Sequence, residues 1–552
     1  MNIMQKKVIY FIGIAVICLS CHKELNEDAR SQVTDNYLST PEGFESGVNA
    51  AYSFLRNYYG NAAGTFLTEA GTDTYTIAIG GDRDFNNYSP NLGPTKSLIT
   101  STWNNFYIAI NACNAVISRG PGIPGLDEEL RNRRVAEARF LRGLYYFILV
   151  QTFGPVHLSL EETQGVLTTA QRAPLATIYE AIVADLSYAV DNLLPVADQY
   201  GRATKPAAQH LLAKVYLTRG WSEAKAPDDF ANAALLAEQV INDSKHQLLE
   251  DFASVFAIGT GEQNDEVIFS VQYGQNVLTN GAGNQTHLHF VPKYDILPGM
   301  KRDVELGRPF SYLRPTDFSL NELYKLGPDA REEKTFIRLY RTNNPGTYTI
   351  HGRQVTLQMG DTAIFFPKTE LTPEEVLATN YSVFPPSKVD EGNFPTLRKH
   401  LDPNRPDLNY EAGSRDFIVM RLAETYLIAA EAYLMAGQPE KALPFINAVR
   451  RRAAAWGKNP EETASNKVAM EVGVSDLSID FILDERGREL SGECLRWFDL
   501  TRTGKLLQRV KAHNELAAAN IKEYHVLRPI PQSQIDRTDG GNAAFPQNEG
   551  YQ

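Results

Sequence analysis

The stretch "AETYLIAAEAYLMAGQPEKALPFINAVRRRA", Ala423–Ala453, decides the fold because it reads as two amphipathic helices joined by a tight turn. Gly437 and Pro439 mark the turn, and the small residues Ala430 and Ala442 permit close helix approach. The 31-residue stretch is close in length to a tetratricopeptide unit of roughly 34 residues. Because such a hairpin cannot bury its apolar face alone, it predicts a stack of similar hairpins.

Several earlier segments repeat this plan, with apolar residues three and four positions apart. Together they predict roughly four hairpins, two or more before residue 250 and at least one after residue 415. The predicted helical segments lie in 40–59, 100–120, 133–158, 175–195, 204–220 and 229–249, with a long loop at 60–97. Within 133–158, Phe153-Gly154-Pro155 is predicted to end the helix.

Between residues 255 and 415 the helical periodicity fades, and Gly, Asn, Pro and Thr become more frequent. Short runs such as "EVIFSVQY" and "KTFIRLY" are typical of β-strands. Compact domains rarely carry long irregular segments without a functional reason. The predicted fold class is therefore mostly α: a tetratricopeptide-like helical hairpin scaffold with an irregular, small-strand-containing insertion subdomain.

The N-terminus carries Lys6 and Lys7, an apolar run from Val8 to Leu19, and then Ser20-Cys21. Twelve apolar residues are too few to span a membrane, which takes roughly 20, but they suit a signal peptide. A small residue before cysteine resembles the lipobox of bacterial lipoproteins, which implies cleavage before Cys21 and acylation of its thiol and amine. Cys18 departs from the usual Leu of that box, and an ordinary secretory signal is the alternative. Several acyl chains, at about 0.8 kcal/mol per buried CH₂, would anchor the protein stably.

The remaining composition is that of an ordinary globular protein, with 43% hydrophobic and 22% charged residues. The formal net charge of −12 argues against binding to nucleic acid. Cys113 and Cys494 lie inside helical apolar patterns, which favours buried free thiols over a disulfide.

Six segments, taken in order, are similar to signatures of the SusD/RagB family of outer-membrane nutrient-binding lipoproteins. They are "STWNNFYIAINACNAVI", "AEARFLRGLYYFILVQTFGPVHL", "RLAETYLIAAEAYLMAG", "ILDERGRELSGECLRWFDLTRTGKL" and the closing pair "LRPIPQSQIDR" and "QNEGYQ". Glu549 replaces the Pro of the closing signature, and Gly492-Glu493 reverses the common Glu-Gly order.

The resemblance implies a tetratricopeptide-like scaffold on the outer face of the outer membrane. It also implies a SusC-like TonB-dependent β-barrel transporter as partner and an oligosaccharide as ligand, with peptide as the alternative. A tetratricopeptide-type interaction module and a glycoside hydrolase are the less favoured alternatives.

The resulting division of the chain treats residues 40–552 as one SusD-like unit behind a lipidated N-terminus. Its predicted segments are a signal peptide at 1–20, a tether at 21–39, an N-terminal helical part at 40–254, an irregular ligand-side subdomain at 255–415, and a C-terminal helical part with a closing loop at 416–552.

Two loops carry the mixture of aromatic, acidic, amide and basic side chains that sugar binding needs. The first loop matches the family's ligand-side region, and Tyr312 and Arg314 are expected to join the second loop. The alternative is that the aromatic residues only pin the loops onto the scaffold. The predicted ligand contacts are Asp73, Tyr75, Arg83, Asn87 and Tyr88 in the first loop, and His289, Phe290 and Tyr294 in the second.

Catalytic chemistry is not indicated. Glu485, Glu489 and Glu493 recur on one helical face among arginines, which favours a structural ion-pair network over acid–base catalysis. His287 and His289 lack further ligands at a recognisable metal-binding spacing. We therefore predict a binding protein that is not an enzyme and has no cofactor; Ca²⁺ binding is left open by the sequence.

Overall fold

The computed structural model describes residues 35–551. Cys21, the predicted signal peptide and most of the predicted tether lie outside the described residues, so those three assignments stay predictions. The described chain is mostly helical with a few short strands, which confirms the predicted fold class.

The N-terminal part is an array of helices in which each helix packs on the next long helix along the chain. The hydroxyl groups of Thr40 and Thr204 cap two of these helices by accepting backbone N–H bonds, and Pro follows each cap. The array comprises α3 (Pro41–Ser53), α6 (Ser97–Arg119), α7 (Glu128–Phe153), α8 (Leu175–Asn192), α9 (Lys205–Gly220) and α10 (Asp229–Asp243).

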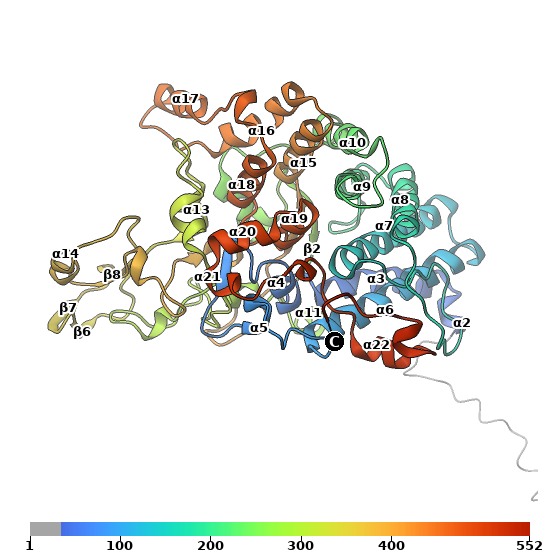
Figure 1. Cartoon of the computed structure of the whole chain (residues 1–552), viewed down its shortest axis with the longest axis horizontal. Coiled ribbons are helices and arrows are strands. Elements are labelled where there is room, and N and C mark those ends of the chain that lie inside the picture. Colours follow the sequence, from blue (N-terminus) through green and yellow to red (C-terminus); the bar gives the residue numbers. More distant parts are fainter. Residues whose placement is uncertain (1–34, 552) are drawn as a thin grey trace, which may run out of the picture.

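The array continues across the insertion, because α10 packs directly on α15 (Leu422–Met435), which pairs with α16 (Pro439–Ala453) (Figure 1). The hairpin predicted from Ala423–Ala453 is therefore confirmed. Gly437 ends its first helix with a φ of +72°, a conformation that suits glycine. The insertion leaves the array and returns without interrupting the stack.

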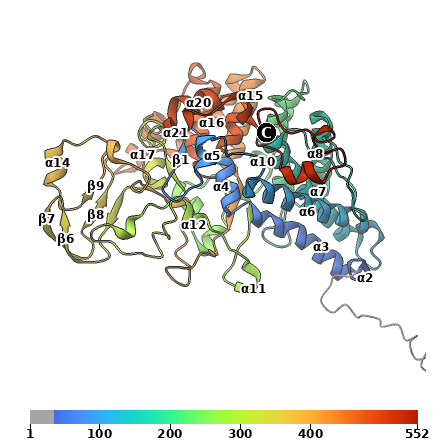
Figure 2. The ribbon, with the colours of Figure 1, turned by 60° about the horizontal axis from the view of Figure 1, so that its bottom comes forward.

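The insertion consists of small sheets and short helices that extend to one side of the molecule (Figures 1 and 2). Antiparallel pairs join β1 (Tyr75–Ile77) to β3 (Leu313–Pro315), β2 (Val267–Val271) to β11 (Phe417–Arg421), β4 (Phe336–Ile337) to β10 (Thr396–Leu397), and β6 (Gly346–Ile350) to β7 (Arg353–Leu357); β8 (Thr362–Phe365) lies between β5 (Leu339–Arg341) and β9 (Ser382–Val383).

Shorter helices complete the described chain. They are α2 (Asp35–Leu38), α4 (Ala62–Thr68), α5 (Arg83–Asn87), α11 (Val277–Asn280), α12 (Thr286–His289), α13 (Arg331–Thr335), α14 (Pro373–Ala378), α17 (Pro460–Ala469), α18 (Ile479–Glu489), α19 (Arg496–Arg502), α20 (Leu506–His513), α21 (Glu515–Ala518) and α22 (Gln532–Arg537).

Segment 60–97 was predicted as a long loop, and this is wrong in part. The segment contains α4, whose residues from Ala63 to Thr68 are all buried, and the short α5. Asn61 caps α4 by accepting the N–H of Ala63. Gly and Asn hid the helix because both residues are poor helix formers, and burial rather than propensity stabilises α4.

The acidic face of segment 485–493 forms a buried ion-pair network, as predicted. Glu485, Glu489 and Glu493 are buried, and Arg331 Nη1 lies 2.8 Å from Glu485 and 2.9 Å from Glu489. Arg421 lies 2.7 Å from Glu489 and 2.8 Å from Glu493. The network joins α18 to the insertion and to β11.

Candidate functional site

Asp73, a predicted ligand contact, is instead buried between two arginines of the C-terminal helices. Its carboxylate lies 2.6 Å from Arg496 and 2.6 Å from Arg509. Burial opposes its ionisation, but the two guanidinium groups outweigh that effect and hold the pKa of Asp73 well below its usual range. Asp73 therefore ties the first loop to α19 and α20.

The two tyrosines of the first loop are also buried. The hydroxyl group of Tyr75 forms a 2.8 Å hydrogen bond with Ser491. Tyr88 has a left-handed backbone, with φ 49°, and its hydroxyl group donates to the carbonyl of Gly71 at 3.0 Å. Both rings hold the loop in place, which is the packing role considered as the alternative.

The predicted ligand contacts in the second loop are buried as well. His289 and Phe290 are buried, and the ring of His289 stacks on Tyr312 with 4.9 Å between ring centroids. The buried hydroxyl group of Tyr294 donates to the carbonyl of Gly307 at 2.9 Å. Six of the eight predicted contacts thus have no surface for a ligand in this structure, and their geometry supports packing. Only Arg83 and Asn87 retain solvent access.

The predicted loops nevertheless meet one another. In the β1–β3 pair, Thr76 lies opposite Arg314 while Tyr75 and Ile77 point into the core. Alternation along the strand therefore brings Thr76 and Arg314 to the same face. A Cβ atom on Gly80 would lie 2.0 Å from the carbonyl oxygen of Phe310, so glycine permits this close approach.

A cleft of about 370 Å³ lies beside the β1–β3 pair. We call it the loop cleft. Side chains from four distant parts of the chain meet there, and carboxylates, amides, an imidazole and a guanidinium are all represented. The loop cleft is lined by Thr76, Arg314, Thr316, Asp317, Leu320, Asn321, Pro386, Val389, Asp390, Glu391, His513, Asn514, Glu515 and Leu516.

Arg314 has few hydrogen-bond partners in the loop cleft. Its only side-chain hydrogen bond within the described chain is a long 3.5 Å contact from Nη1 to the carbonyl of Pro315, and its buried Nε has no partner. Burial lowers the pKa of Arg314 from its usual value, while Glu391, Asp390 and Asp317 act against that effect. The donor that Arg314 can offer to a ligand is therefore its Nη2, for which the described chain supplies no partner.

At the rim, Arg83 forms a bidentate ion pair with Glu391, which lines the loop cleft. The Arg83 side chain is 53% exposed. Asp390 accepts the backbone N–H groups of Gly392 and Asn393 at 2.8 Å each. Arg83 thus reaches the site through Glu391, whereas the carbonyl of Asn87 accepts from Asn520, just after α21.

Sequence reasoning missed the C-terminal wall of the loop cleft. Asn514 donates to the carbonyls of Thr72 and Tyr75, at 2.8 and 3.1 Å, and accepts from Thr76. Figures 1 and 2 show α21 close to α5 and β1. The only sequence signal was that Asn514 can cap α21, which it does by accepting from Ala517.

His513, another residue of the cleft wall, presents a flat aromatic ring. The imidazole of His513 stacks on Phe318, with 4.0 Å between ring centroids and 26° between ring planes. Both side chains are half-buried. Only His513 of this pair lines the loop cleft, because Phe318 packs against His513 and Arg509. The imidazole ring beside amides, carboxylates and a guanidinium can lie against the apolar face of a sugar ring.

Residues 35–551 contain no group of three or more His, Cys, Asp or Glu side chains placed to hold a metal ion. Within the same residues, no helix combines the length and apolarity needed to cross a bilayer. Cys113 and Cys494 are free, buried thiols. The absence of a cofactor stays a prediction.

Comparison with known proteins identifies the family. Residues 265–551 match the model described as the SusD family. The chain belongs to the SusD family. Residues 28–217 match a second SusD-like model, described as starch-binding associating with outer membrane.

This SusD-family chain has full-length relatives. A SusD-like protein of Formosa agariphila is 27% identical over 564 residues, covering 96% of each chain. The starch-binding protein SusD of Bacteroides thetaiotaomicron is 24% identical over 448 residues, covering 77% of this chain and 73% of its own.

Solved structures show the same fold. A SusD homologue from Bacteroides thetaiotaomicron superposes with a TM-score of 0.72 at 22% identity, covering 95% of this chain and all of its own. A laminarin-binding SusD-like protein gives 0.67 at 24% identity, covering 93% of this chain and all of its own.

Proposed function

We propose that this SusD-family protein binds an oligosaccharide in the loop cleft. The observation that carries the proposal is Arg314, a half-buried side chain of the loop cleft whose Nη2 has no hydrogen-bond partner in the described chain. Hydrogen-bond acceptors and the ring of His513 line the same cleft. Sugar hydroxyl groups both donate and accept hydrogen bonds, so they match carboxylates, amides and a guanidinium together. The names of two relatives, one starch-binding and one laminarin-binding, support a glycan as the ligand class.

The proposal places the protein at the outer membrane, held by acyl chains on Cys21 and facing the cell exterior. There it would pass its ligand to a SusC-like TonB-dependent transporter. The lipobox-like Ser20-Cys21 and the family model described as associating with the outer membrane support this location.

We propose binding without hydrolysis. Glycoside hydrolysis uses two carboxyl groups of opposed roles at the scissile bond. Four carboxylates line the loop cleft. Glu391 is engaged by Arg83, Asp390 by its own turn and Asp317 by Asn321, while Glu515 is exposed to solvent. These contacts favour a fixed binding surface. Release of reducing ends from any glycan by the purified protein would overturn this part of the proposal.

The test measures binding of neutral oligosaccharides and of peptides to the full-length chain in detergent, by calorimetry. Arg314→Gln removes the charge and most donors at similar length, and we expect at least a tenfold loss of affinity, about 1.4 kcal/mol. Arg451→Gln, at a surface ion pair with Glu471, is the control and should bind like the parent.

Unchanged oligosaccharide binding by Arg314→Gln would remove the loop cleft from the proposal. Binding of peptides but not of sugars would replace the ligand class, since a cleft with mixed donors and acceptors also suits peptide groups. Each variant is compared with the parent by thermal unfolding, and a Tm within about 2 °C shows that the fold is intact.

A further inference from the structure

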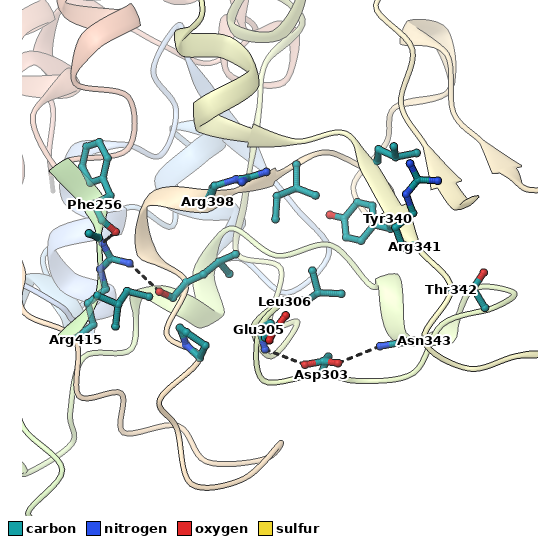
Figure 3. Close-up of a pocket in the computed structure, with 16 residues that line it drawn as sticks. Phe256, Asp303, Glu305, Leu306, Tyr340, Arg341, Thr342, Asn343, Arg398 and Arg415 are labelled. Atoms are coloured by element: carbon teal, nitrogen blue, oxygen red, sulfur yellow. Dashed lines mark hydrogen bonds between the residues drawn. The ribbon is translucent and has the colours of Figure 1, made fainter. Parts of the chain in front are cut away.

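A second, larger pocket of about 700 Å³ lies in the irregular part of the chain (Figure 3). It shares no lining residue with the loop cleft. Its walls come from residues 256–258, 303–306, 337–343 and 398–403, with Arg415 at one side. We call it the arginine pocket, because Arg341, Arg398 and Arg415 all line it.

None of the three arginines forms an ion pair within the described residues. Arg398 makes no side-chain hydrogen bond there, and Arg341 donates only to the hydroxyl group of Thr362 at 3.3 Å. Buried Arg415 donates only to carbonyls, those of Leu401 and Phe256. Burial lowers the pKa of Arg415 to about 10, so it is still a cation at neutral pH. Arg341 and Arg398 therefore have no carboxylate at ion-pair distance, whereas Glu262, Asp402 and Asp416 act on the charge of Arg415 from farther away.

The carboxylates of the arginine pocket do not neutralise these charges. Asp303 accepts from the backbone N–H of Glu305 at 3.0 Å and from Asn343 at 3.3 Å. Glu305 is exposed at the rim. Neither carboxylate lies within ion-pair distance of an arginine in residues 35–551. The pocket thus has more positive than negative groups, and its acids are occupied or open to water.

The floor of the arginine pocket is apolar. Leu306, Ile337 and Leu401 line it together with the ring of Tyr340. The Tyr340 hydroxyl group is already bonded to Thr396 at 2.7 Å, so its ring acts only as a surface. An apolar floor with a few directed polar groups is the usual composition of a ligand site, and its volume falls within the roughly 300–1,000 Å³ of such sites.

The positions of the arginines specify the shape of the ligand. Figure 3 shows Arg415 at one side of the arginine pocket, Arg341 at the other, and Arg398 between them. A single compact anion needs converging donors, whereas these donors are spread along the pocket. They suit an extended molecule that carries several anionic groups, with its uncharged faces against Leu306 and Ile337.

We propose that the arginine pocket is a second binding site, for an oligosaccharide that bears carboxylate or sulfate groups. The choice of a sugar chain over an acidic peptide rests on the proposed function. Arg341 and Arg398 bind the anionic groups with their free N–H donors, and Arg415 supplies fixed positive charge at the closed side. Arginine suits this role because its planar guanidinium binds carboxylate and sulfate oxygens in pairs.

The test measures binding by calorimetry to the full-length chain in detergent. The probes are oligogalacturonate, oligomannuronate, a chondroitin sulfate oligosaccharide, methyl-esterified oligogalacturonate as the neutral match, and poly-glutamate. We expect at least one anionic glycan to bind, the esterified match to bind at least tenfold more weakly, and added salt to weaken the anionic glycan.

The double variant Arg341→Gln/Arg398→Gln should weaken that glycan at least tenfold. Both side chains are exposed, so the fold should be unaffected. Arg353→Gln is the matched control, because it changes an exposed arginine of the same part of the chain that does not line the pocket. It should bind like the parent protein.

Five results would overturn the proposal, and the first four separate it from the proposed function. If neutral oligosaccharides bind but no anionic glycan does, the loop cleft stands and the arginine pocket fails. The pocket also fails if Arg314→Gln, rather than the double variant, abolishes anionic binding. Equal binding of the esterified probe excludes charge recognition. Poly-glutamate binding with the same sensitivity to the double variant makes this an acidic-peptide site. If no glycan of any kind binds, the proposed function fails first.

Discussion

Buried acidic side chains are stabilised in this protein in two different ways. Asp73 is ionised between Arg496 and Arg509. Glu69 is equally buried but has no ion pair in the described chain; one oxygen accepts the Leu495 N–H at 3.2 Å, and the other has no partner. Burial raises the pKa of Glu69 to about 8, against weaker opposition from its backbone hydrogen bonds. At neutral pH, Asp73 is therefore ionised, whereas Glu69 in the same core is mostly protonated and uncharged.

This difference gives a prediction for Glu69→Gln. Between the unfolded pKa of about 4.3 and the folded pKa of about 8, only the folded state holds the proton. The free energy of unfolding of the parent therefore falls as pH rises through that range. Glutamine keeps an accepting oxygen and never ionises, so the variant should gain roughly 1–3 kcal/mol over the parent at pH 8.5.

Urea unfolding at several pH values checks this prediction. The advantage of Glu69→Gln should be smallest near pH 4.5 and should grow until about pH 8. A difference that stays constant with pH would show that the effect is packing, and would contradict a protonated carboxyl at position 69.

At the scale of elements, the contact between α10 and α15 joins the two halves of the array. Its cluster is built largely from alanine, including Ala233, Ala237, Ala429 and Ala432, with Ile428. Small side chains let the helix axes approach closely, and residues three and four positions apart present one surface. The insertion begins and ends beside this contact, so its tight packing positions everything that the insertion carries.

We therefore predict that Ala237→Leu lowers the free energy of unfolding by about 1–3 kcal/mol, because the added carbon atoms overfill a closed contact. Leu235→Ala, on an exposed position of the same helix, is the matched control and should change stability by less than about 0.5 kcal/mol. Denaturant unfolding measures both. Equal effects of the two variants would mean that the α10–α15 contact is not tightly packed.

At the scale of the whole molecule, stability depends on carboxylates buried against arginines. Burial alone would favour their neutral form, but neighbouring guanidinium groups outweigh it and hold the pKa values of Asp73, Glu485, Glu489 and Glu493 below their usual range. These groups contribute stability above their unfolded pKa values near 4, and that contribution is lost as pH falls toward the folded values.

The protein should therefore unfold steeply in acid, losing most of its stability between about pH 4 and pH 2. Glu489→Gln should lower the free energy of unfolding by about 3–5 kcal/mol at pH 7, because it leaves buried arginines without their partner. The variant should also lose less stability than the parent as the pH falls from about 4 to 2. Circular dichroism during acid titration measures both effects. A parent protein equally stable at pH 7 and pH 3 would contradict this account.

Part of the candidate site could be predicted from the sequence. The residue mixture of two loops indicated a polar binding region, and the structure does bring those loops together through the Thr76–Arg314 pairing. The sequence did not predict which side chains face the cleft. Irregular segments lack the periodicity that assigns buried and exposed faces in helices and strands, so Tyr75 and Tyr294 looked as available as Arg83.

The sequence by itself determined the helical hairpins, the loss of helical periodicity in the insertion, and the family. Helix periodicity and signature motifs are local properties of the chain. Only the tertiary structure decided that α10 stacks on α15, that Asp73 is an internal ion-pair partner, and that His513 and Asn514 complete a cleft begun by Thr76. Those outcomes depend on packing between residues hundreds of positions apart, where burial and charge pairing, rather than local preference, set which side chains meet.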